Sequence, residues 1–366
     1  MKKTLYIFIG ASEINCVNLM YTLNNKENRS ILSPNSIEFL LEGENIYESI
    51  VNNNYQEVNK IANIIKQKIN CDKRHTKFLI AEPAFFTLSQ KNSQYIYDKI
   101  CKNNNDFKVK IIVFVRRQDD LIYNSYSHYI TSLEGKSGYS VNEKLTNLIN
   151  RMSDQKYILN HEVSINKWES TFGKENIIVK LYKNNSDTIR KTLSILGFGA
   201  IDSKIKLVNK EFPILNPEQL ILLKHCKNLI NIDHLEILKK RINISVSNYQ
   251  SVLSPKLREK ILNEYSKSNN NIAKKYFNQT TLFDSYNKKE DENEWNKLDI
   301  FENGYFDKIM SYFKNTNKDL YDALKNCEFN KIRPNEYMIG QNIDNLNLYL
   351  NKKKNLLKKT KTQKNN

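Results

Sequence analysis

Two adjacent arginines follow the most apolar segment of the chain. Arg116 and Arg117 come directly after the run "VKIIVFV", and the next residues, "QDDLIYNSYSHYI", have helical spacing with acids in the first turn. A guanidinium group can hold phosphate through paired hydrogen bonds, and a hydroxyl or amide two turns into the following helix can bind another oxygen. The pattern therefore indicates an anion site at the end of this strand.

Two residues of that helix could complete the site. Asn124 lies eight residues after Arg116, and Ser125 lies eight residues after Arg117. We favour Arg116, with Asn124 or Ser125 as its partner, and the sequence leaves the choice between these pairs open. In the alternative interpretation, one arginine only forms a surface ion pair with one of the two aspartates that follow.

Two further side chains could carry out proton transfer. Glu82, in "LIAEPAFF", follows an apolar strand and could take a proton from a hydroxyl group. The alternative is a surface glutamate that caps the loop before Pro83. His128, on the same predicted helix as Asn124, is a weaker candidate for the base, and a partly exposed histidine without a role is the competing interpretation.

The first strand ends in a turn that has the shape of a phosphate loop. In "LYIFIGASEINCVNLM", Gly10 and Ser12 precede a helical pattern, where free backbone N–H groups could bind an anion. The turn contains no lysine, and Glu13 stands where a cation is expected. A carboxylate about 4 Å from a phosphate charge is opposed by roughly 4 kcal/mol near a protein surface. This loop is therefore poorly suited to an ordinary anionic donor.

Strand-like and helical segments alternate in the first half of the chain. Helical patterns such as Ile46–Ile69 and Asp119–Leu133 separate four nearly unbroken apolar runs, which are Leu5–Ile9, Phe78–Ala81, Val109–Val115 and Ile177–Tyr182. The sequence predicts an α/β fold, a three-layer structure with a parallel sheet. A ligand of such a sheet binds beyond the carboxyl ends of its strands, where Arg116 is expected.

The second half is predicted to be helical. Pro217–Ile230 and Ser254–Tyr276 have helical spacing, and Ser254 and Pro255 fit the N-cap and the first helical position. The expected organisation is an α/β domain over 1–285, a charged linker over 286–297, a small helical appendage over 298–350 and a disordered basic tail over 351–366.

Composition restricts the function classes. The formal charge is +17, and seven lysines in the last fifteen residues account for much of it, leaving +10 elsewhere. The tail is expected to touch an acidic membrane surface or a polyanion, whereas nucleic acid is not favoured because no basic and aromatic pattern of a binding module occurs. Five cysteines without CxxC spacing predict neither a zinc site nor disulfides. No long apolar segment occurs, so we expect a cytoplasmic, soluble protein. We also expect no bound metal.

The segment "RRQDDLIYNSYS" resembles a motif of the bacterial sulfotransferase family, a P-loop sulfotransferase-like group. In that family, an arginine and a serine hold the 3′-phosphate of 3′-phosphoadenosine 5′-phosphosulfate, and the second strand often ends in Ser-Ser-Glu, where Glu82 stands here. The segments "WESTFGKENIIVKLYK" and "LSPKLREKILNEYSKSNNNIAKKYF" are also similar to the family, so the resemblance spans about Leu5–Phe283.

The first loop departs from the family. Its pattern reads like G-x-x-K-T-G-T-T, and Glu13 replaces the lysine here. Either Glu13 turns outward and Lys2, Lys3 or Lys180 substitutes, or the donor differs, or the site is inactive. A different donor with the same handle is 3′-phosphocytidine diphosphoramidate, which carries a less anionic transferable group.

The resemblance implies a transferase of a sulfuryl or phosphoramidate group, acting on a hydroxyl of a bacterial surface polysaccharide or its precursor. The alternative is a catalytically inactive scaffold or binding partner in polysaccharide biosynthesis. A glycosyltransferase has less support, because "QDD" at the helix start fits a capping role better than a metal and sugar-nucleotide site.

Overall fold

The computed structural model describes fourteen stretches of the chain. The described residues are 3–10, 19, 21–23, 25–32, 37–40, 43–102, 106–131, 145–154, 158–199, 204–207, 217–226, 232–241, 253–284 and 305–326. The chain forms two compact units, which are described separately below. Unit 1 comprises Met1–Arg117, Ser153–Phe212 and Tyr265–Phe283, and unit 2 comprises Gln118–Met152, Pro213–Glu264 and Asp284–Asn366.

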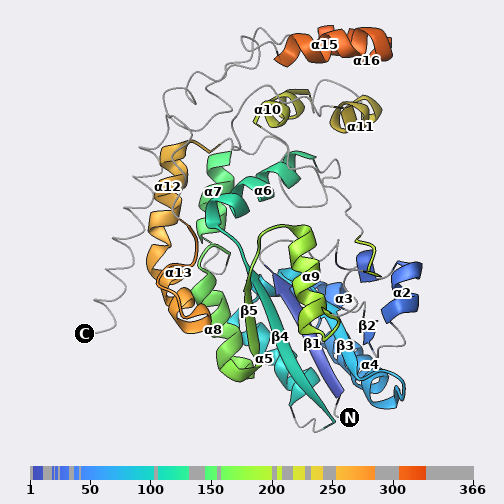
Figure 1. The fold of residues 1–366 in the computed structure, drawn as a ribbon, viewed down its shortest axis with the longest axis vertical. Coiled ribbons are helices and arrows are strands. Elements are labelled where there is room, and N and C mark those ends of the chain that lie inside the picture. The colour runs from blue at the N-terminus through green and yellow to red at the C-terminus, as the bar shows by residue number, and fades with distance from the viewer. Residues whose placement is uncertain are drawn as a thin grey trace. The chain divides into compact units, whose positions relative to one another are not determined.

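Unit 1 contains a five-stranded parallel sheet in the order β2-β3-β1-β4-β5 (Figure 1). Its strands are β1 (Lys3–Gly10), β2 (Ile37–Leu40), β3 (Lys77–Ala81), β4 (Phe107–Val115) and β5 (Ile177–Leu181). The four predicted strands and the parallel α/β architecture are confirmed. Strand β2 was not predicted, because it is a four-residue edge strand in which only Ile37 and Leu40 are buried.

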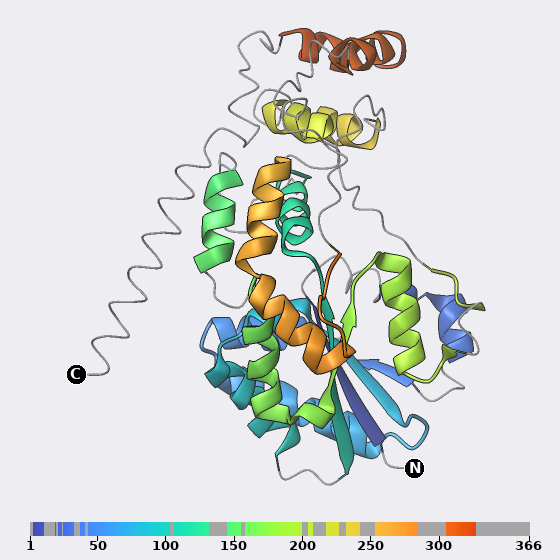
Figure 2. The same ribbon diagram turned by 60° about the vertical axis from the view of Figure 1, so that its left-hand side comes forward.

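Strands β1 to β4 each contribute side chains to two separate cores, whereas β5 contributes Ile177 and Val179 to one of them. Leu5, Ile7 and Ile9 of β1 enter one core, whereas Phe8 enters the other and stacks on Phe114 of β4, with ring centroids 5.4 Å apart. This alternation follows from the two-residue repeat of a strand, and both faces are apolar because helices cover both. Figure 2 shows α2 (Lys26–Leu32) and α9 (Asn185–Ile195) together on one side of the sheet.

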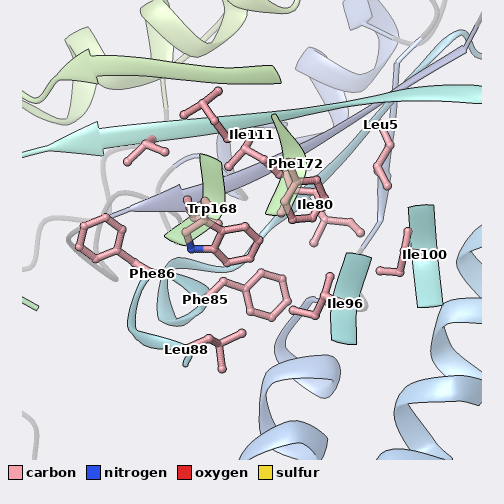
Figure 3. Packing of buried hydrophobic residues seen from close by; sticks show 14 of the residues in the cluster. Leu5, Ile80, Phe85, Phe86, Leu88, Ile96, Ile100, Ile111, Trp168 and Phe172 are labelled. Carbon is pink, nitrogen blue, oxygen red and sulfur yellow. The ribbon is translucent and has the colours of Figure 1, made fainter. Parts of the chain in front are cut away.

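The other face carries the larger core. It is covered by α3 (Gly43–Val51), α4 (Tyr55–Cys71), α5 (Gln90–Ile96), α8 (His161–Phe172) and α13 (Ser266–Ile272) with the short turns beside them. Trp168 of α8 is fully buried there and stacks on Phe172, with ring centroids 5.4 Å apart, and Phe85 lies against it (Figure 3). Large aromatic rings supply much of the apolar area that such a core buries.

Two of the predicted helical segments are interrupted. The segment Ile46–Ile69 is two helices, because Asn53 adopts a left-handed conformation (φ 55°) and Asn54 then caps α4 by accepting a hydrogen bond from the Glu57 N–H. The segment Ser254–Tyr276 divides at Tyr265 into α12 (Pro255–Glu264) and α13. Asparagine tolerates the left-handed region and also caps helices well, so Asn53 and Asn54 both suit the break between α3 and α4.

The elements of unit 2 are helices. They are α6 (Gln118–Thr131), most of α7 (Leu145–Asp154), α10 (Pro217–Cys226), α11 (Ile232–Arg241), α12, α15 (Tyr305–Thr316) and α16 (Lys318–Asn326). Helix α12 begins at Pro255, and Ser254 accepts a hydrogen bond from the Leu257 N–H, which confirms the predicted cap. The buried residues Ile309, Phe313, Leu320 and Leu324 lie on α15 and α16.

Several domain predictions lie outside the described residues. These include the linker 286–297 and the basic tail 351–366, while α15 and α16 fall within the predicted appendage. The domain boundaries therefore stay predictions. Within the described segments, no helix combines the length and the apolar character that a bilayer span requires.

Candidate functional site

The carboxyl ends of four neighbouring strands bring together residues from distant parts of unit 1. Glu82 follows β3, and its N–H donates to the Phe8 carbonyl of β1 (3.0 Å). Gly10, at the end of β1, pairs with Phe114 of β4, two residues before Arg116. Strand β1 lies between β3 and β4, so the later strands of the chain are placed on both sides of β1. Open α/β sheets bind ligands at such a switch point.

Arg116 is a buried cation at this edge. Arg116 is only 8% exposed. Its guanidinium carbon lies 4.4 Å from the centre of the ring of Tyr182, the residue that follows β5. The Tyr182 N–H donates to the Val115 carbonyl (2.9 Å), which fixes the two residues side by side. Stacking on an aromatic face orients a guanidinium plane, while its N–H edge can still bind an anion. Arg117 is half-buried.

His161, at the start of α8, binds the backbone of Arg116. The Nε2 atom of His161 lies 2.6 Å from the Arg116 carbonyl oxygen, and the side chain is fully buried. Burial lowers the pKa of His161 to about 4, against a smaller opposite effect of the Arg116 carbonyl. The ring is therefore neutral at pH 7, and Nε2 carries its hydrogen because a carbonyl oxygen can only accept.

Glu82 is buried and held by two parts of the chain. It is 8% exposed, and its Oε1 accepts from the Ala84 N–H (2.8 Å), so Glu82 caps the turn η2 (Pro83–Thr87). The alternative interpretation, a surface glutamate that caps the loop before Pro83, is correct about the cap. It is wrong about the position, because Glu82 is buried. A Cβ atom at Gly43 would lie 3.0 Å from the Glu82 Cβ, so the start of α3 packs closely on this residue.

Lys167 anchors the far end of the same turn. Its buried ammonium group donates to the Phe86 carbonyl (2.9 Å) and to the Leu88 carbonyl. Burial lowers the pKa of Lys167 to about 7. The sequence interpretation missed both Lys167 and His161. The available signal is the polar series His161, Ser164, Lys167 and Thr171, which follows one side of a helix that also carries Trp168.

Three other predicted site residues, Asn124, Ser125 and His128, belong to unit 2. On α6, Asn124 is buried and its amide donates to the Asp120 carbonyl, whereas Ser125 is half-buried. The predicted pairing of Arg116 or Arg117 with these residues joins two units and stays a prediction. His128 lies on α6, but its side chain is outside the described residues, as are Ser12 and Glu13.

The two aspartates after the arginines form an ion pair with a distant residue. Asp119 has a fully buried side chain and lies 2.9 Å from Nε of Arg258 on α12, and Asp120 lies 3.4 Å from Nη2 of the same guanidinium. This contact spans 139 positions of sequence. Asp119 and Asp120 lie in the first turn of α6, where acids favour a helix, as the capping interpretation of "QDD" expects.

A cavity in unit 1 lies at the other end of β3. Its volume is about 530 Å³, and it is lined by Glu38, Lys68, Cys71, Asp72, Lys73, Arg74 and Phe78. None of these residues belongs to the predicted site. Within the described segments, no group of His, Cys, Asp and Glu side chains is arranged to hold a metal ion.

Comparisons with known proteins give one structural likeness. No protein-family model matches the chain, and no curated protein matches it. A crystal structure of a sulfotransferase from Alicyclobacillus acidocaldarius is similar over 66% of this chain and 97% of that chain, with 12% sequence identity and a TM-score of 0.36.

Proposed function

We propose that the protein is a sulfotransferase-like group transferase that uses a 3′-phosphorylated nucleotide as its donor. The observation that carries this proposal is Arg116, a buried arginine stacked on Tyr182 at the carboxyl end of β4. Burial raises the strength of its interaction with an anion, and the aromatic stack limits the loss of side-chain entropy on binding. A 3′-phosphate is a ligand of matching charge and geometry.

In the proposed reaction, the acceptor hydroxyl oxygen bonds to the sulfur or phosphorus of the transferred group as the bond to the donor's bridging oxygen breaks. The hydroxyl proton passes to Glu82, which follows β3 on the other side of β1. The nucleotide leaves with both electrons of the broken bond. Such a loose transition state depends mainly on alignment and charge stabilisation. The proposed acceptor is a hydroxyl of a surface polysaccharide or its precursor.

Two donors fit the 3′-phosphate handle. They are 3′-phosphoadenosine 5′-phosphosulfate and 3′-phosphocytidine diphosphoramidate. Glu13 in the first loop favours the second donor, because the group that it transfers is less anionic. Adenosine and cytidine 3′,5′-bisphosphates share the handle and differ in the base, so they distinguish the donors.

Thermal unfolding of the full chain with each bisphosphate tests the proposal. At a hundred times the dissociation constant, a bound nucleotide stabilises by about 2.7 kcal/mol, which raises the Tm of a chain of this length by about 3 to 4 °C. We expect Arg116→Gln to remove the shift. Arg74→Gln is the matched control, because Arg74 is an exposed arginine before β3, at the amino end of that strand. A shift that survives in Arg116→Gln contradicts this assignment.

The second candidate function is a non-catalytic scaffold in polysaccharide biosynthesis, which the loss of the loop lysine favours. A native chain that is folded but gives no shift with either nucleotide supports the scaffold and argues against the transferase. Transfer of a labelled group to a polysaccharide excludes the scaffold.

A further inference from the structure

Helix α8 contacts the segments that carry Arg116 and Glu82. His161 in its first turn binds the Arg116 carbonyl, and Lys167 binds the carbonyls of Phe86 and Leu88 at the end of the turn that begins after Glu82. The His161 ring also lies against the Phe86 ring, with centroids 5.8 Å apart. Phe86 is therefore held at its carbonyl by Lys167 and at its ring by His161.

Ionisable side chains are seldom buried as deeply as these two. His161 and Lys167 are 0% and 4% exposed, and each buries a titratable group that would be better solvated at the surface. Two apolar residues of similar size would fill the same volume without that cost. What the polar pair adds is direction, because a hydrogen bond fixes where each carbonyl lies and so fixes the backbone that carries it.

We propose that His161 is a positioning residue for the nucleotide-binding arginine, and that Lys167 supports it through Phe86. The inference rests on the proposed function of Arg116 as the anchor of the 3′-phosphate. By holding the Arg116 carbonyl, His161 fixes the backbone from which the guanidinium extends over Tyr182. By holding Phe86, Lys167 fixes the ring on which His161 rests. Neither side chain needs to touch the nucleotide.

The N-terminus of α8 is itself held in place. Oδ1 of Asn160 accepts from the Val163 N–H (3.2 Å) and from the Ser268 hydroxyl of α13 (2.9 Å). The His161 backbone therefore starts from a fixed point. Ser268 of α13 is therefore connected to α8, the helix that holds the Arg116 backbone.

Variants of His161 separate positioning from packing. His161→Gln keeps an N–H donor of similar reach, whereas His161→Met removes the donor and keeps an apolar side chain of comparable size. Affinity for adenosine or cytidine 3′,5′-bisphosphate, whichever the native chain binds, is measured by calorimetry on the full chain below every variant's unfolding temperature. We expect His161→Met to weaken binding about tenfold, and His161→Gln to stay within about threefold of the native chain.

Two further variants make the result specific. Lys167→Met should also weaken nucleotide binding. In the double variant with His161→Met, the fold-loss of affinity should be smaller than the product of the two single fold-losses, because both side chains act on Arg116 through one series of contacts. Ile165→Ala is the structural control. Ile165 is a buried core residue of the same helix, so it should lower Tm while leaving nucleotide affinity unchanged.

Three outcomes overturn the inference: equal binding by His161→Met and the native chain, equal losses in His161→Met and His161→Gln, or a loss in Ile165→Ala as large as in His161→Met. If the native chain binds neither nucleotide, the proposed function fails separately. Positioning is then decided by crystal structures of the native chain and His161→Met. A guanidinium displaced from Tyr182 supports the inference, and an unmoved guanidinium overturns it.

Discussion

At the scale of single residues, two buried polar side chains hold backbone carbonyls of the segments that carry the candidate site. His161 binds the Arg116 carbonyl, and Lys167 binds the Phe86 carbonyl. Burial lowers the pKa of both side chains, to about 4 and about 7, because desolvation disfavours their charged forms. These groups therefore make the stability of the protein depend on pH in two separate windows.

The window of His161 gives a prediction. The unfolded chain takes up a proton on this histidine near pH 6.5, whereas the folded chain does so only near pH 4. Stability is therefore full above pH 6.5 and falls by about 1.4 kcal/mol per pH unit as the pH decreases to 4, about 3 kcal/mol in total. Urea unfolding of the native chain and of His161→Gln, measured from pH 7 to pH 4, checks this.

The glutamine of the control cannot titrate, so the difference between the two curves isolates His161 from the carboxylates, which titrate in both proteins. We expect the native chain to lose stability relative to His161→Gln as the pH falls. Parallel curves would show that His161 is not buried in its neutral form.

At the scale of elements, caps decide where four helices of unit 1 begin. Asn54, Ser89, Asn160 and Asn184 each accept a hydrogen bond from a backbone N–H in the first turn of the helix that follows. Asn160 differs in that it also accepts from Ser268 of α13, so it links α8 to α13. At the other end of α8, Gly173 has a φ of 84°, which favours glycine and turns the chain toward β5.

A double-mutant cycle measures the link between α8 and α13. Replacing Asn160 by Ala should lower the free energy of unfolding by about 1 to 2 kcal/mol, because it removes the cap and the Ser268 partner. Asn160→Ala and Ser268→Ala should show a coupling energy of about 1 kcal/mol by urea unfolding. The matched pair is Asn184→Ala with Ser268→Ala, since Asn184 caps α9, and it should show none. Equal coupling in both cycles contradicts the link.

At the scale of the whole molecule, charge is distributed unevenly along the chain. The formal charge of the full chain is +17. Seven lysines lie in the last fifteen residues, which contain no acid. Lysines close to an anionic membrane contribute about 1 kcal/mol each, and salt weakens this attraction. A transferase acting on a surface polysaccharide precursor would benefit from such an attachment.

The tail therefore gives a prediction about membranes. The full chain should sediment with vesicles that contain phosphatidylserine at low salt and be released at high salt, whereas a chain ending at residue 351 should remain in solution. The control replaces the seven tail lysines by glutamine, which keeps the length of the tail, and vesicles of phosphatidylcholine alone provide a second control. Binding that survives the lysine replacement would assign the attraction to another surface.

The sequence by itself determined the α/β class, the four longer strands and the cap of α12. These features are local, because a strand buried on both faces must be a nearly unbroken apolar run, and Ser254 acts on its own helix. It also selected Arg116 and Glu82 as residues that follow strands. The edge strand β2 was missed because it is short and only half of its residues are buried, so it has no continuous apolar run. The break at Asn53 was missed because it interrupts the helical spacing only briefly.

Only the tertiary structure decided the partners of the polar groups. The contact of His161 with Arg116 and the ion pair of Arg258 with Asp119 join residues that are 45 and 139 positions apart. Periodicity reveals which face of an element is apolar, but it does not say which distant carbonyl a buried donor reaches. That choice depends on how whole elements pack, and it buried Glu82 beside β1, whereas the alternative interpretation had this glutamate at the surface.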